Sequence, residues 1–125
     1  MKEIITTTNA PAAIGPYSQA VKAGGFLYIS GQLPIDPTTG AITGECVKGQ
    51  TAQSLKNIGA ILAEAGYTFN NVVKTTVLLA DINDFGAMNE VYADFFQGNC
   101  PARAAFAVKD LPKGAMVEIE AVAYC

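Results

Sequence analysis

The sequence predicts a two-layer α+β fold, in which two helices cover one face of a β-sheet. Two observations lead to this prediction. Runs rich in β-branched residues alternate with two stretches of helical periodicity, and turn-forming residues separate them. Half of the residues are hydrophobic and 15% are charged, which is typical of a chain with a packed core. A length of 125 residues suits one domain, residues 1–125.

The chain begins with three predicted strands. Residues 2–7 ("KEIITT") predict an edge strand. Residues 18–30 contain two short apolar runs joined at Gly24 and Gly25, which indicates a hairpin because glycine tolerates a positive φ. Residues 34–40 ("PIDPTTG") have the composition of a loop.

A helix is predicted from about Val47 to Ala65, and Gly66 stands where a left-handed C-cap belongs. Its periodic positions are Thr51, Leu55, Ile58 and Leu62. Residues 71–80 ("NVVKTTVLLA") follow it and are rich in β-branched side chains. They therefore predict a largely buried strand.

A second helix is predicted after Asn83 or Asp84, either of which can cap it. It stops at Gly98, and Pro101 bars its continuation. The apolar stripe of this helix consists of Phe85, Met88, Tyr92 and Phe95. We interpret the stripe as core rather than as part of a ligand site.

Two predicted strands, 102–108 and 115–124, close the chain and are joined by a turn-rich segment at 109–114. In the first strand, alternation places Arg103, Ala105 and Ala107 on one face and Ala104, Phe106 and Val108 on the other; in the second, Val117, Ile119 and Ala121 share a face. Glu118 and Glu120 therefore lie on the opposite face of the last strand.

The second face of the sheet is far from fully polar, and two helices cannot cover it as well as the first. We therefore expect an oligomer.

Composition excludes several classes of function. The net charge is −3 and the pI about 4.7, which disfavours binding to a nucleic-acid backbone. The chain has no histidine, so histidine-based catalysis and histidine-ligated metals are excluded, and no carboxylate run has calcium-loop spacing. Cys46, Cys100 and Cys125 form neither a disulfide framework nor a metal motif. Because the sequence has no membrane span or targeting segment, we expect these unpaired cysteines to be those of a protein in the reducing cytoplasm.

Arg103 is the only arginine, and the other seven cationic side chains are lysines. A lone guanidinium among alanines suggests a fixed two-point grip on a carboxylate. The alternative is a rim arginine whose stem covers apolar surface while its head stays in water. This stretch of sequence favours neither.

Five motifs together resemble the RidA family, the reactive imine/enamine deaminases also called the YjgF family. They are "GPYSQAV", "ISGQLP", "NEVYADFF", "PARAAFAV" and "EIEAVA", and they cover about Ile14 to Ala123. The segment from Pro101 to Ile119, with P-A-R followed by E-I, is the most diagnostic.

The resemblance implies a chorismate-mutase-like fold with a mixed sheet and two helices on one face. It implies a homotrimer in which the other sheet faces form a central barrel and the clefts lie between subunits. The implied activity is hydrolysis of reactive 2-imino acids, such as 2-iminobutanoate and 2-iminopropanoate, to 2-oxo acids and ammonia. These imines escape from dehydratases that depend on pyridoxal phosphate, whereas the deaminase itself uses no cofactor.

The resemblance also implies roles for individual residues. Arg103 binds the substrate carboxylate, and Glu120, in the closing E-I-E, positions a water. The residues implied to line the cleft are Tyr17, Ser30, Gly31 and Asn89. Ala105 stands where many members have cysteine, so a thiol role is excluded there, and we expect backbone contacts to keep binding intact.

These residue types suit the chemistry. A guanidinium orients a carboxylate and the carbon next to it, and a carboxylate orients water and carries protons. Glu118 is expected to be an ordinary solvated carboxylate of the strand. Residue types alone leave Tyr17, Ser30 and Asn89 as ordinary structural positions.

The residues leave two alternative functions. A non-enzymatic trimer that binds small metabolites and regulates a partner would use the same arginine. An endoribonuclease or translation inhibitor is disfavoured by the acidic pI, the single arginine and the lack of histidine.

Arg103 and Glu120 can be brought together in two ways. A hairpin through residues 109–114 pairs them within one chain. The resemblance and the uncovered sheet face favour an interface, with Arg103 and Asn89 of one chain facing Tyr17, Ser30 and Glu120 of the next.

Overall fold

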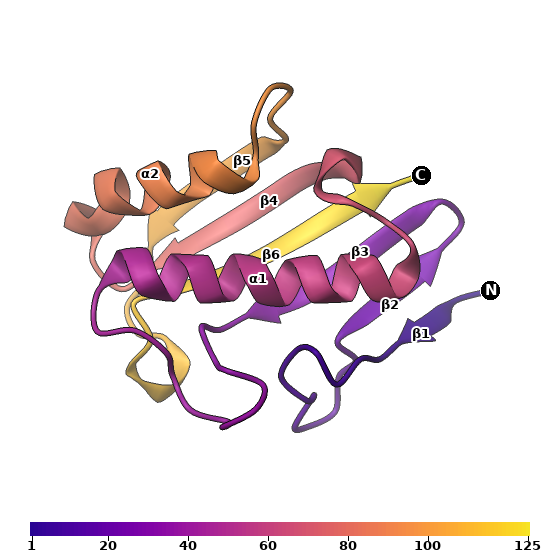
Figure 1. The fold of residues 1–125 in the computed structure, drawn as a ribbon, viewed down its shortest axis with the longest axis horizontal. Helices are drawn as coiled ribbons and strands as arrows, with labels where there is room; N and C mark the ends of the chain where they lie inside the picture. The colour runs from indigo at the N-terminus through magenta and orange to yellow at the C-terminus, as the bar shows by residue number, and fades with distance from the viewer.

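The computed structural model describes residues 1–125 and contains a six-stranded sheet in the order β1-β2-β3-β6-β4-β5 (Figure 1). The elements are β1 (Glu3–Ile5), β2 (Ala20–Ala23), β3 (Phe26–Gln32), α1 (Val47–Ala65), β4 (Val72–Leu79), α2 (Phe85–Phe95), β5 (Ala102–Ala107) and β6 (Val117–Tyr124), with short 3-10 turns η1 (Phe69–Asn71), η2 (Ile82–Asp84) and η3 (Pro112–Gly114). Each predicted strand and helix is present. Only β4 and β5 pair in parallel, so the sheet is mixed, as expected.

Helix α1 ends at the predicted glycine. Gly66 has a φ of 82°, and the N–H groups of Gly66 and Tyr67 donate to the carbonyls of Ala63 and Leu62. These bonds satisfy carbonyls that the helix itself leaves free, which stops α1 and turns the chain toward β4.

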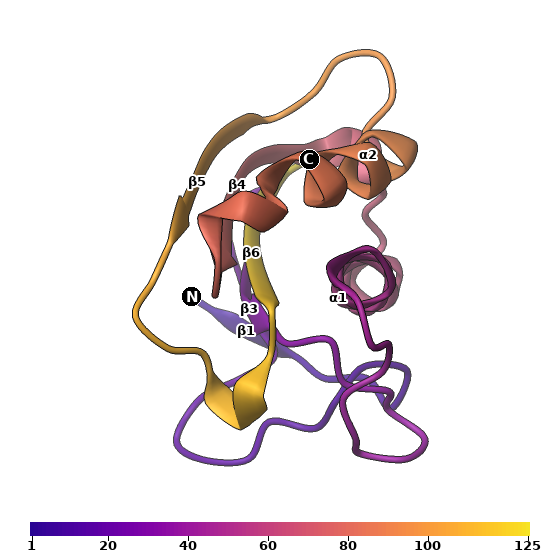
Figure 2. The same cartoon turned by 90° about the vertical axis from the view of Figure 1, so that its left-hand side faces the viewer.

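Both helices lie on the same side of the sheet, which Figure 2 shows nearly edge-on. The core lies between the two layers and includes Leu55, Ile58, Leu62, Val77, Leu79, Val117 and Ile119, all of which are buried. Neither helix combines the length and the apolar character that a bilayer-spanning segment needs. The two-layer α+β fold is therefore confirmed.

The face away from the helices, called the open face below, carries large exposed side chains. Phe26, Tyr28, Phe106 and Tyr124 are 41–52% exposed. The rings of Phe26 and Tyr124 pack with centroids 4.8 Å apart. The expected half-apolar second face is thus present, and nothing in one chain covers it.

Strand β4 lies between β5 and β6, so the hairpin alternative for residues 102–124 is wrong. Strands β4 and β5 are parallel and are joined through α2, as parallel strands require a crossover. Strand β6 then pairs antiparallel with both β3 and β4. Neighbours in the sequence are therefore not neighbours in this part of the sheet.

Candidate functional site

The guanidinium of Arg103 lies in a cradle formed by α2. Its Nη1 donates a hydrogen bond of 2.7 Å to Oδ1 of Asn89. Its Cζ lies 4.8 Å from the ring centroid of Tyr92 and 5.4 Å from that of Phe85. These residues follow one another at intervals of four and three along the helix, and so form one stripe. Phe85 and Tyr92, which belong to the apolar stripe interpreted as core, thus also contact the arginine.

The cradle favours the gripping alternative for Arg103. The side chain is exposed, yet an amide accepts a hydrogen bond from its guanidinium and two aromatic rings lie beside it. Guanidinium has five N–H donors, and the bond to Asn89 uses one of them. Enough donors remain for two parallel bonds to a carboxylate.

Ala105 follows Arg103 on the same face of β5. It is partly buried, is in register with Val77 and packs against the core. Its methyl group brings no chemical function to the site.

A second group of predicted residues lines a hollow of about 680 Å³. Tyr17, Ser30, Gly31 and Glu120 all border it, and so does Glu118. Its other walls come from residues 11–14, the segment after β3 and η3, including Ile14, Leu33 and Lys113.

The β3 wall of this hollow is irregular. The pairing of β3 with β6 shifts register between Ile29 and Gln32, which releases Ser30 and Gly31 from the ladder. The hydroxyl of Ser30 donates to the carbonyl of Ser18 at 2.6 Å, so it holds the segment that follows Tyr17.

Gly31 allows β3 to approach a carboxylate closely. A Cβ atom at this position would lie 2.5 Å from Oε2 of Glu118 and 3.0 Å from its Cδ. Any side chain at position 31 would therefore displace Glu118.

The expectation that Glu118 is an ordinary solvated carboxylate is wrong. Its side chain is half-buried in the hollow, whereas Glu120 is exposed. Burial, and then the neighbouring charge of Glu120, raise the pKa of Glu118 above its usual range. Glu118 and Glu120 point to the same face of β6, and Glu118 lies close to Gly31.

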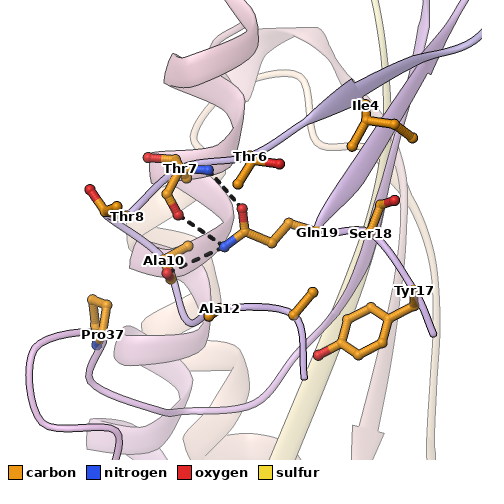
Figure 3. Close-up of a pocket in the computed structure, with 11 residues that line it drawn as sticks. Ile4, Thr6, Thr7, Thr8, Ala10, Ala12, Tyr17, Ser18, Gln19 and Pro37 are labelled. Atoms are coloured by element: carbon orange, nitrogen blue, oxygen red, sulfur yellow. Dashed lines mark hydrogen bonds between the residues drawn. The ribbon is translucent and has the colours of Figure 1, made fainter. Parts of the chain in front are cut away.

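The segment that leads to Tyr17 is held by the buried side chain of Gln19 (Figure 3). Its Oε1 accepts from the N–H of Thr7 at 2.7 Å. Its Nε2 donates to the carbonyls of Thr7 and Pro11, at 3.0 and 2.7 Å. Tyr17, whose side chain is 52% exposed, lies between this hollow and a second one of about 510 Å³.

The predicted residues therefore form two groups within one chain. Arg103 is in register with Thr75, which is buried under α2, whereas Glu120 is in register with Thr76. Adjacent residues of a strand point to opposite faces. The arginine cradle lies on the helix side, and Glu120 lies on the open face.

Comparisons with known proteins agree with this architecture. The sequence model of the family described as endoribonuclease L-PSP matches residues 7–125. The mouse 2-iminobutanoate/2-iminopropanoate deaminase is 58% identical over 123 residues, covering 98% of this chain and 91% of that protein. The Rid protein YyfA of Yersinia pestis has a TM-score of 0.97 at 50% identity, with both chains covered completely.

A crystal structure of Escherichia coli TdcF with bound serine has a TM-score of 0.94 at 44% identity, with 98% of each chain covered. The family match covers nearly the whole chain, and so do these relatives. The chain belongs to the endoribonuclease L-PSP family, which is the RidA (YjgF) family that its motifs predict.

Proposed function

We propose that this protein is a deaminase that hydrolyses reactive 2-imino acids, such as 2-iminobutanoate and 2-iminopropanoate, to 2-oxo acids and ammonia. The observation that carries the proposal is the cradle that holds the only guanidinium of the chain ready for a carboxylate. The mouse relative, 58% identical, is named for this activity. The ligand of TdcF, serine, also bears a carboxylate next to its nitrogen-bearing carbon.

The complete site is proposed to form between subunits of a homotrimer whose open faces make a central barrel. Two observations support this arrangement. The open face carries exposed aromatic side chains, and the two groups of site residues lie on opposite faces of one chain. Arg103 and Asn89 of one subunit would then face the hollow lined by Tyr17, Ser30 and Glu120 of the next.

The reaction begins with substrate orientation. Arg103 holds the carboxylate of the imino acid through two parallel hydrogen bonds and so fixes the adjacent C=N carbon. Protonation of the imine nitrogen makes this carbon strongly electrophilic. The carbon–nitrogen double bond then accepts water, which adds its oxygen to the carbon to give a carbinolamine.

The paired carboxyl groups of Glu118 and Glu120 are suited to move the protons. Glu118, with its raised pKa, holds a proton more readily than a solvated carboxyl group and can deliver it to nitrogen. Glu120 orients the water and takes up its proton. As the carbinolamine collapses, Glu120 returns its proton to the amino nitrogen and Glu118 takes up the hydroxyl proton. The carbon–nitrogen bond breaks, the C=O bond forms, ammonia leaves and the 2-oxo acid remains, with both carboxyl groups back in their starting states.

This chemistry needs no cofactor, because an iminium ion is already reactive and requires only orientation and proton transfer. We further propose a cytoplasmic location, because Cys46, Cys100 and Cys125 are all unpaired and exposed.

The charges that line the hollow disfavour RNA. Two carboxylates, Glu118 and Glu120, face a single cation, Lys113, among its lining residues. Such a surface repels a phosphate backbone. The charges of this site therefore do not support RNA cleavage, the activity that the family's description names.

The test is an assay in which an amino-acid oxidase generates the imine and semicarbazide traps it. The protein should lower semicarbazone formation from several imino acids, and the Arg103→Lys variant should do so far less at the same concentration. A protein that binds 2-oxo acids without any effect on trapping would instead be a metabolite-binding regulator.

A further inference from the structure

Tyr92 is a buried side chain of α2 that the proposed reaction does not use directly. Its ring lies under the guanidinium of Arg103, with the centroid 4.8 Å from Cζ. Its hydroxyl shares a hydrogen bond of 2.7 Å with the hydroxyl of Thr75, which is completely buried on β4. Thr75 is in register with Arg103 itself.

Two contacts hold the ring of Tyr92 in place. The bond to Thr75 holds its polar end, and the ring of Phe96 packs on it with centroids 4.6 Å apart. The guanidinium of Arg103 lies over the ring, and only 6% of Tyr92 remains exposed. An aromatic face attracts a cation electrostatically and also limits the rotamers of a long side chain.

We infer that Tyr92 is a positioning residue for Arg103, and that its ring is the platform that holds the guanidinium in its carboxylate-binding orientation. The inference rests on the proposed function, because it assigns Tyr92 a part in recognising the carboxylate. Asn89 fixes the guanidinium through Nη1, and Tyr92 fixes its plane. Tyr92 acts through Arg103 and need not touch the substrate.

Three variants separate positioning from stability. Tyr92→Leu removes the platform, Tyr92→Phe keeps the ring but loses the bond to Thr75, and Phe95→Leu makes the same kind of exchange elsewhere on α2. Phe95 packs on Phe69 and is therefore a matched control. Thermal unfolding of all three variants reports their stability separately.

The first measurement is the dissociation constant of 2-oxobutanoate by calorimetry. Tyr92→Leu should weaken binding by roughly three- to thirtyfold, as expected for the loss of a partly desolvated cation–π contact. Tyr92→Phe should restore binding to within about threefold of wild type, and Phe95→Leu should leave it unchanged. Binding by Tyr92→Leu that equals wild type, or an equal loss in Phe95→Leu, would overturn the inference.

The second measurement needs no ligand. Because Arg103 is the only arginine, its Nε–H group gives a single assignable NMR signal. This proton should be shifted upfield by the rings, and the shift should decrease in Tyr92→Leu but persist in Tyr92→Phe and Phe95→Leu. An unchanged signal in Tyr92→Leu refutes the platform. If wild type binds no 2-oxo acid, the proposed function fails while this signal still tests the platform.

Discussion

Arg103 and Glu120 lie on opposite faces of one sheet, because they are in register with adjacent residues, Thr75 and Thr76, of the strand between them. A substrate as small as a 2-imino acid cannot reach both side chains through the sheet. If both act on one substrate molecule, each must therefore belong to a different copy of the chain.

Arg103→Lys should reduce kcat/KM by roughly tenfold to a hundredfold, although the charge is kept, because an ammonium group cannot form two parallel bonds to a carboxylate. Steady-state kinetics with an imine generated in situ measure this effect. Lys56→Arg, at an exposed position of α1, is the control for the reverse exchange. Turnover like wild type in Arg103→Lys would reject the carboxylate-binding role.

Glu118→Gln and Glu120→Gln should both fold and still bind 2-oxobutanoate, yet turn over imines slowly. We expect the larger loss of kcat in Glu118→Gln, because Glu118 is the desolvated group whose pKa is raised. Calorimetry and kinetics on the same preparations separate binding from chemistry. Turnover like wild type in either variant would contradict the proton-transfer role of that residue.

Gly31→Ala should lower turnover toward that of Glu118→Gln, because the new Cβ would lie 2.5 Å from Oε2 of Glu118 and displace the carboxyl group. Gly49→Ala is the matched control. Its Cβ would meet only Cα of Gly44 at an ordinary 3.5 Å, and alanine in a helix should add about 0.5–1 kcal/mol of stability. Full activity in Gly31→Ala would show that the position of Glu118 does not matter.

Stability should depend on pH through Glu118. Burial, and then Glu120, raise the pKa of Glu118 above 4.5, so the folded state binds this proton more tightly than the unfolded state does. The resulting contribution to stability is fully present below pH 4.5 and is lost as the pH rises through the raised pKa. Glu118→Gln cannot ionise, so it should gain stability relative to wild type as the pH rises.

Urea unfolding between about pH 4 and pH 8 measures this difference in the free energy of unfolding. Glu64→Gln, at an exposed position of α1, is the control. A constant difference between Glu118→Gln and wild type across this range would refute the account of the Glu118 pKa.

The sequence predicts the elements well where local signals are strong. Helix α1 spans Val47–Ala65, as its periodicity and Gly66 indicate. The hairpin of β2 and β3 turns at Gly24, which has a φ of 62°. The pairing of β5 was not predictable in this way, because residues 109–114 look like a hairpin loop although β4 separates the two strands.

The sequence proposes a set of candidate site residues but not how they are arranged. Glu118 and Glu120 share a face of β6, yet Glu118 is half-buried beside Gly31, which is far away in the sequence, and Glu120 is exposed. Tyr92 belongs to an apolar stripe typical of a helix core. Its proposed role in positioning Arg103 depends on contacts with Arg103 and Thr75, which lie on two different strands.

We propose that Arg103 of one chain acts on the same substrate as Glu118 and Glu120 of another. Arg103→Ala and the double variant Glu118→Gln/Glu120→Gln should each be inactive alone. The two are unfolded, mixed in equal amounts and refolded together, and mass spectrometry of the native assemblies confirms that mixed trimers form.

In random cyclic assembly, about a quarter of the interfaces join an intact arginine to intact glutamates, so about a quarter of wild-type activity should return. If instead each site belongs to one chain, every site keeps its defect. Mixed trimers that recover no activity would contradict the shared site.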